Sequence, residues 1–233
     1  MRPVTRGPAP NTYTAYKQAF NDLVTRMGRY CSYCERFLPT SLAVEHVVPK
    51  SLDPALETAW DNFLLGCTNC NSVKLAQPTN QRDFLWPDRD NTSRAYEYAA
   101  GGYVRVMPGL TRSLQSKAVK LMSLVGLERH PNIGPPTPPP ASGDQRWMQR
   151  DEIWKLAERC RDRIARLDAV GSGDEGRAFT LELAQARGFF SVWLAVFSAD
   201  TAMLNLLIAG FPGTPPECFD ASGKAIKRKK GRI

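Results

Sequence analysis

The sequence predicts an α+β protein in which a small cysteine-rich module, stapled by a metal ion, is followed by a mainly helical C-terminal region. Two C-x-x-C pairs lie within residues 31–70, and the apolar run at 44–48 between them is typical of a short β-strand. Apolar residues recur at helical spacing over most of residues 144–208. A chain of 233 residues can bury one full core, or one core and a smaller satellite domain.

Three elements are predicted around the cysteine-rich module. Apolar residues recur at helical spacing over residues 12–27, and Gly28 is the expected C-cap. Residues 96–107 carry two glycines at their centre and are typical of a β-hairpin. Residues 114–127 have one apolar face and predict a short helix, whereas the proline-rich first ten residues predict extended chain.

The second half of the chain predicts helices behind a proline-rich break. The run at 135–140 cannot be a helix or a central strand, so it predicts a semi-rigid linker or a long loop. Asp144 is the expected cap of a long amphipathic helix, and further helices run to about Ile208. The predicted organisation is residues 1–134 for the module with its N-terminal helix and hairpin, 135–141 for the linker or loop, 142–216 for the helical region and 217–233 for a basic tail.

The net charge of +8 is concentrated at the C-terminus. Residues 224–232 hold six basic side chains and no acidic one, so the remaining chain carries a charge of only +2. This predicts a disordered basic arm that binds phosphate backbones without sequence preference. A solvated tail that only aids solubility is the alternative. The candidate nucleic-acid contacts in the tail are Lys227, Arg228, Lys229 and Lys230.

Cysteine usage and hydropathy predict a protein of the reducing cytoplasm that does not enter a membrane. The N-terminus lacks the apolar stretch of a secretory signal. Cys160 and Cys218 stand alone, which predicts unpaired buried thiols and not a disulfide scaffold. The most apolar stretch, 189–209, carries Asp200 near its middle, so it predicts buried helices and not a membrane span.

The two C-x-x-C pairs predict a structural zinc site. Thirty-two residues separate the first pair, Cys31 and Cys34, from the second, Cys67 and Cys70. Each pair can sit on a tight turn, and four thiolates complete a closed tetrahedral shell that leaves no open position for chemistry. In so small a module, metal binding would contribute on the order of 10 kcal/mol to folding. Two redox-active motifs are the alternative, but neither pair follows a strand and opens a long helix.

A Glu-His dipeptide between the two cysteine pairs is the candidate for chemistry. A lone histidine is more often structural than catalytic, but Glu45 lies directly beside His46. The other histidine of the chain, His130, is distant in sequence, and Asn62 and Asn71 flank the second cysteine pair. These neighbours raise the odds that His46 is a general base and not a structural histidine.

The order C-x-x-C, E-H-x-x-P-K-S, W-D-N-x-L, C-x-x-C-N-x-x-K resembles the HNH endonuclease family over residues 31–74. The resemblance implies a ββα-metal fold in which His46 is the general base and Asn62 braces the loop that aims it. Glu45, where the family more often has Asp, and Asn71 would hold a catalytic Mg²⁺ or Mn²⁺. Lys50 and Lys74 would contact phosphate.

The resemblance implies phosphodiester hydrolysis of DNA, with RNA, including transfer RNA, left open as a substrate. Residues 1–4, 31–36, 45–46 and 49–51 are also similar to the HNH nuclease subunit of Septu-type and retron-linked anti-phage systems. Those nucleases work beside an ATPase subunit, so the helices after residue 141 are a candidate docking surface. Two rival interpretations are a non-catalytic zinc-binding nucleic-acid module and an adaptor that binds a partner protein.

Overall fold

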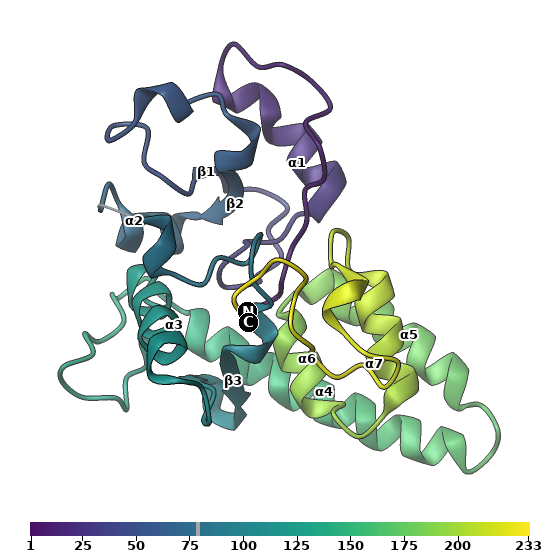
Figure 1. The fold of residues 1–233 in the computed structure, drawn as a ribbon. Coiled ribbons are helices and arrows are strands. Elements are labelled where there is room, and N and C mark those ends of the chain that lie inside the picture. Colours follow the sequence, from purple (N-terminus) through teal and green to yellow (C-terminus); the bar gives the residue numbers. More distant parts are fainter. Residues whose placement is uncertain (78–79) are drawn as a thin grey trace.

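The computed structural model describes residues 1–77 and 80–233. Its strands form two separate antiparallel pairs, one in the cysteine-rich module and one in the hairpin that follows. Figure 1 shows these strands with helices α1 to α3 on one side of the molecule and helices α4 to α7 on the other, with both chain ends at the centre. The predicted α+β class is confirmed.

The N-terminal helix ends where helical spacing predicts it, but it begins at Tyr16 and not at residue 12. Its first turn is the 3-10 helix η1 (Tyr16–Ala19), which continues directly into α1 (Phe20–Met27). Gly28 ends α1 with a φ of 75°, a value that favours glycine. Leu23 and Met27 are buried on the face that packs against the module.

The cysteine-rich module is a ββα unit. Strand β1 (Leu42–His46) pairs antiparallel with β2 (Phe63–Cys67), so that Glu45 lies opposite Leu64 and His46 opposite Phe63. Two 3-10 turns, η2 (Pro54–Leu56) and η3 (Trp60–Asn62), shape the connection. Helix α2 (Thr68–Lys74) begins where β2 ends, and every residue of β2 is buried.

The predicted hairpin is formed by β3 (Tyr96–Ala99) and β4 (Tyr103–Val106). Its turn includes Gly102, where a Cβ atom would meet the Trp147 carbonyl oxygen at 2.0 Å, so only glycine allows this close approach to the helical region. Helix α3 (Arg112–Leu124) follows. Short 3-10 turns complete this part of the chain: η4 (Gln81–Asp83), η5 (Thr92–Arg94) and η6 (Ala100–Gly102).

The C-terminal region is helical, as predicted. It contains α4 (Arg146–Asp168), α5 (Gly173–Arg187), α6 (Phe190–Val196), α7 (Thr201–Gly210) and the 3-10 turn η7 (Pro216–Cys218). Asp200, the carboxylate within the apolar stretch, caps α7 by accepting a bond from the Met203 amide and pairs with Arg177 at 3.0 Å. Across the described residues, no helix combines the length and hydropathy needed to cross a membrane.

The helical region packs directly on the first cysteine turn. The Glu35 carboxylate accepts bonds from the Ser191 amide at 2.8 Å and from the Ser191 hydroxyl at 2.6 Å. The Phe189 amide donates to the Glu35 carbonyl oxygen at 2.8 Å. Gly188 pairs with Arg36, and a Cβ at Gly188 would meet the Glu35 carbonyl oxygen at 2.5 Å. The two parts of the chain therefore share a buried interface.

The expectation of a disordered basic arm is wrong. The tail folds back on residues 84–91, and its last residue, Ile233, is buried. The Arg232 amide donates to Asp90 at 2.7 Å, and Asn91 donates from its side chain to two tail carbonyl oxygens. Arg228 donates to the carbonyl oxygens of Val4 and Pro87. Buried Asp90 and Asn91 supply these partners from far away in the sequence, so composition alone does not show them.

Deleting residues 141–233 is expected to prevent the remaining chain from folding cooperatively. The deletion removes α6 and the other helices whose apolar side chains share one core with the rest of the chain, and it takes away the Ser191 partners of Glu35, so apolar surface of the remaining chain becomes exposed to water. Circular dichroism with thermal melting measures this. A fragment 1–140 that melts in one sharp transition would contradict it.

Candidate zinc site and active site

The four cysteine sulfurs are arranged to hold a zinc ion, as predicted. All four are buried and reduced, and their Sγ atoms lie within 4.8 Å of one another. The Sγ atoms of Cys31 and Cys70 are 3.7 Å apart, and those of Cys34 and Cys67 are 3.6 Å apart. A tetrahedral zinc ion with Zn–S bonds of about 2.3 Å requires sulfurs roughly 3.8 Å apart. The donor set and its geometry therefore fit zinc.

Backbone amides and two arginines surround the thiolates. The Cys67 amide donates to the Cys31 sulfur at 3.4 Å, and the Cys70 amide donates to the Cys67 sulfur at 3.5 Å. The Arg146 guanidinium, at the start of α4, lies 3.2 Å from the Cys70 sulfur and also pairs with Asp144. These donors offset the negative charge that four thiolates bring into the core.

The pKa values around the cluster follow from burial and from these charges. Burial raises the pKa of the Cys31 and Cys70 thiols, while hydrogen bonds from the other three thiols lower the pKa of Cys67. Burial acts to lower the pKa of Arg146, but the neighbouring Cys70 and Asp144 charges more than offset it and leave that pKa raised. The pKa of Arg36 is also raised, because the charges of Cys34 and Cys67 outweigh burial, which acts to lower it.

The Glu45 carboxylate faces α2. The Lys74 ammonium lies 2.8 Å from Glu45 Oε1 and donates to the His46 carbonyl oxygen at 2.8 Å. Asn71 stands one turn before Lys74 on the same face of α2. A Cβ atom at Gly66 would meet Asn71 Oδ1 at 2.8 Å and the Glu45 Cβ at 3.0 Å. Glu45 and Asn71 thus converge over a glycine that leaves them room.

This pair of residues fits a hard divalent cation. Asn71 Oδ1 is buried without a hydrogen-bond partner among the described residues. Burial raises the pKa of Glu45, while the charge of Lys74 and the hydrogen bond from Lys74 oppose that shift. A carboxylate beside an unpaired amide oxygen is the ligand chemistry that Mg²⁺ and Mn²⁺ prefer. Lys74 compensates the Glu45 charge in this arrangement.

The His46 ring has its own set of contacts. Neighbouring residues on a strand point to opposite faces, and the ring packs edge-on against Tyr16 and Phe63 at centroid distances of 5.0 and 5.3 Å. His46 Nε2 lies 2.9 Å from the Glu57 carbonyl oxygen. A carbonyl can only accept, so Nε2 carries the proton and Nδ1 keeps the lone pair of the neutral ring. Within the described residues, the ring contacts neither the Glu45 carboxylate nor the Asn71 amide.

Asn62 holds the segment that follows His46. Its Oδ1 accepts from the Val48 amide at 2.8 Å, and its Nδ2 donates to the carbonyl oxygens of Val48 and Leu56. Its backbone carbonyl accepts from the Val47 amide at 2.9 Å. These contacts connect the two ends of the connection between β1 and β2, which is the geometry expected of a bracing residue.

The predicted phosphate contacts differ in their surroundings. Lys50 is exposed, pairs with Glu57 at 2.7 Å and lies over the Tyr16 ring, close to His46. Lys74 is buried in its pair with Glu45 and presents no ammonium to solvent. In the tail, Arg228 is held by carbonyl oxygens, whereas Lys227, Lys229 and Lys230 are exposed. The last two line a cavity of about 360 Å³ that also has acidic walls, Asp88 and Asp90.

Residues 31–77 match the HNH endonuclease family. The match spans the cysteine turn, both strands of the ββα unit and α2. This segment is an HNH endonuclease domain, which supports a nuclease-type function and the binding of nucleic acid. No curated protein matches the chain.

Several residues of the site were not identified from the sequence. Gly66, Tyr16 and the Glu57 carbonyl each position a candidate catalytic group. Gly66 carries a local signal, because it interrupts an otherwise apolar strand immediately before Cys67. Arg146 carries none, since 76 positions separate it from the sulfur that it contacts.

Cys67→Ser is expected to release zinc and to lower the free energy of unfolding by more than about 4 kcal/mol, because the cluster pins both β2 and the cysteine turn. The zinc content of the purified protein, assayed after denaturation, measures the loss of zinc. Chemical unfolding curves measure the change in the free energy of unfolding. Cys160→Ala, at a buried free thiol outside the cluster, is the matched control and should keep one zinc per chain. Equal zinc content in the two variants would contradict the assignment.

Proposed function

We propose that the protein is a metal-dependent endonuclease that hydrolyses phosphodiester bonds in DNA. The observation that carries the proposal is the unpaired, buried Asn71 Oδ1 beside the Glu45 carboxylate, within a domain of the HNH endonuclease family. A bound Mg²⁺ or Mn²⁺ would neutralise the negative charge that builds up on the phosphate during attack. Glu45 and Asn71 would hold it.

The remaining residues have roles that their contacts support. His46 Nδ1 accepts a proton from the attacking water, while the Glu57 carbonyl holds the proton on Nε2 and the Tyr16 and Phe63 rings orient the imidazole. Asn62 keeps the segment after His46 in place. Lys74 favours the ionised form of the buried Glu45 carboxylate, which is the form that ligates a cation.

The nucleic-acid partner is proposed to meet the exposed lysines. Lys50 lies nearest to His46, and Lys227, Lys229 and Lys230 extend the basic surface at the tail. The proposed site contacts a backbone phosphate and not a base, so we expect low sequence specificity. A defence role and an ATPase partner depend only on the resemblance of residues 1–4, 31–36, 45–46 and 49–51, and they stay predictions.

His46→Ala is expected to reduce plasmid cleavage in Mg²⁺ or Mn²⁺ by at least about 100-fold, because the substitution removes the proposed proton acceptor, Nδ1 of His46. Gel assays with plasmid, linear, single-stranded and RNA substrates measure the loss and identify the substrate. His130→Gln, at the other histidine, is the control. Unchanged cleavage by the His46 variant, with folding and DNA binding intact, would favour the non-catalytic zinc module.

Metal binding is expected to weaken at least about tenfold in Glu45→Gln and in Asn71→Ala, since each substitution removes one half of the oxygen pair. Titration of Mn²⁺ followed by electron paramagnetic resonance measures binding independently of cleavage. Glu57→Gln removes an exposed carboxylate that pairs with Lys50, and it serves as the control. Equal Mn²⁺ affinity in all three variants would contradict the proposed ligands.

A further inference from the structure

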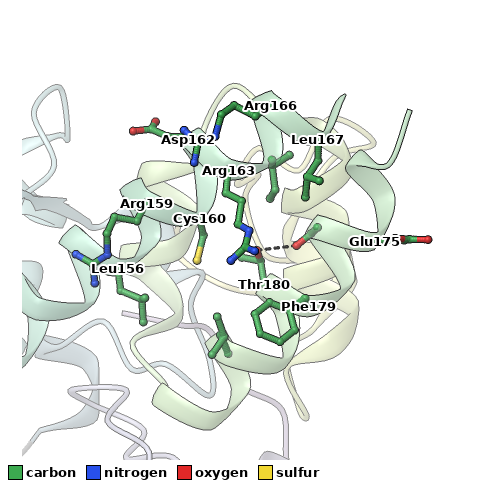
Figure 2. A pocket seen from close by; sticks show the side chains of 13 residues that line it. Leu156, Arg159, Cys160, Asp162, Arg163, Arg166, Leu167, Glu175, Phe179 and Thr180 are labelled. Atoms are coloured by element: carbon green, nitrogen blue, oxygen red, sulfur yellow. Dashed lines mark hydrogen bonds between the residues drawn. The ribbon is translucent and has the colours of Figure 1, made fainter. Parts of the chain in front are cut away.

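A groove of about 920 Å³ runs between α4 and α5 (Figure 2). It lies toward the C-terminal end of α4, whereas the zinc site is at the first turn of this helix. Its floor is apolar and joins both helices. The side chains that form this floor are Leu156, Cys160, Ile164, Leu167 and Leu183. Nothing in the proposed nuclease mechanism uses this groove.

One rim of the groove is a row of arginines on α4. Arg159, Arg163 and Arg166 follow one another at positions i, i+4 and i+7, which places them on one face of the helix. Figure 2 shows them along the α4 side of the groove. All three are exposed, and none makes an ion pair or a hydrogen bond within the described part of the chain. The row therefore presents three uncompensated guanidinium groups.

Helix α5 carries a stripe of the opposite charge at the same spacing. Glu175, Phe179 and Glu182 also occupy positions i, i+4 and i+7. Phe179 lines the groove, yet 56% of its surface is exposed, which is unusual for a phenylalanine. Neither glutamate makes an ion pair within the described residues. The stripe is acidic at both ends and aromatic at its centre.

We propose that the α4–α5 groove is the interface of a homodimer, in which each copy inserts its α5 stripe into the groove of the other. In such a two-fold interface the same surface is used twice, so each contact occurs in both directions. Phe179 of one copy covers the apolar floor of the other, and Glu175 and Glu182 meet the arginine row. One chain therefore carries both complementary surfaces, the groove with its arginine row and the α5 stripe.

The charge distribution favours a second copy over nucleic acid. Residues 156–183 contain five arginines and six acidic residues, so this surface has no net positive charge with which to attract a polyanion. Its charges are instead separated into an arginine row and an acidic stripe. Protein interfaces with complementary charges around an apolar centre have this composition.

The position of the groove makes the proposed dimer useful for cleavage. The first turn of α4 contacts the zinc cluster through Arg146, and the groove lies at the far end of this 23-residue helix, which is about 34 Å long. A dimer joined at the grooves therefore carries two HNH domains on two outward helices. This consequence rests on the proposed nuclease function, since a dimer with two sites could cut both strands of a duplex in one encounter.

Sedimentation equilibrium of the full-length, zinc-loaded chain tests the dimer without using nuclease activity. The expected mass is twice the 25.9 kDa of one chain. Arg163→Glu and Phe179→Asp should each weaken dimerisation at least about thirtyfold, because they change exposed residues at the centre of the interface. Arg161→Glu makes the same charge change on the same helix but outside the groove, and it should leave the mass unchanged.

A charge exchange distinguishes a specific interface from a general loss of association. A chain with Arg159→Glu and Arg163→Glu, and a chain with Glu175→Arg and Glu182→Arg, should each be monomeric alone because like charges then face each other. Mixed together, they should form a heterodimer, since each groove again meets a stripe of opposite charge. Two results would overturn the proposal. In the first, the wild-type chain stays monomeric up to about 100 μM. In the second, the dimer persists in the Arg163→Glu and Phe179→Asp variants. If the wild-type chain forms the dimer but cleaves no nucleic acid, the proposed nuclease function is contradicted and the dimer stands.

Discussion

The four-cysteine cluster is the constraint on which the rest of the structure depends. It joins the turn that carries Cys31 and Cys34, which precedes β1, to the junction between β2 and α2. The same turn presents Glu35 to α6, and the cluster itself contacts Arg146 of α4. The helical region is therefore attached to the HNH domain through the residues that surround the metal site. A structural metal in this place organises the whole chain and not one module alone.

The alternation of side chains along β1 separates two kinds of chemistry within one dipeptide. Glu45 points towards α2, where Asn71 and Lys74 complete an environment of oxygen and compensating charge. His46 points towards the N-terminal helix, where aromatic rings and the Glu57 carbonyl fix its orientation and its tautomer. A cation ligand and a proton acceptor need different surroundings, and adjacent positions on a strand supply both.

Helix α4 relates the proposed active site to the proposed dimer interface. Its first turn is fixed by buried hydrogen bonds from Arg146, and its last turns carry the arginine row on an exposed surface. Buried arginines with several carbonyl partners make the first turn rigid, whereas the row is free to meet another molecule. Helix α4 thus connects the HNH domain, residues 31–77, with the proposed dimer interface, which lies outside the family match.

The sequence by itself determined the elements and the local chemistry. Helical spacing, the paired glycines of the hairpin, the C-x-x-C spacing and the Glu-His dipeptide each depend on residues close together in the chain, and these local patterns predicted the fold class and the zinc ligands correctly. Only the tertiary structure decided which groups meet across long separations. Lys74 pairs with Glu45, Arg146 reaches the Cys70 sulfur over 76 positions, and Arg232 reaches Asp90 over 142 positions. Such contacts form because a buried charge or amide needs a hydrogen-bonding partner. Residues close in sequence do not predict which distant residue the fold will bring to it.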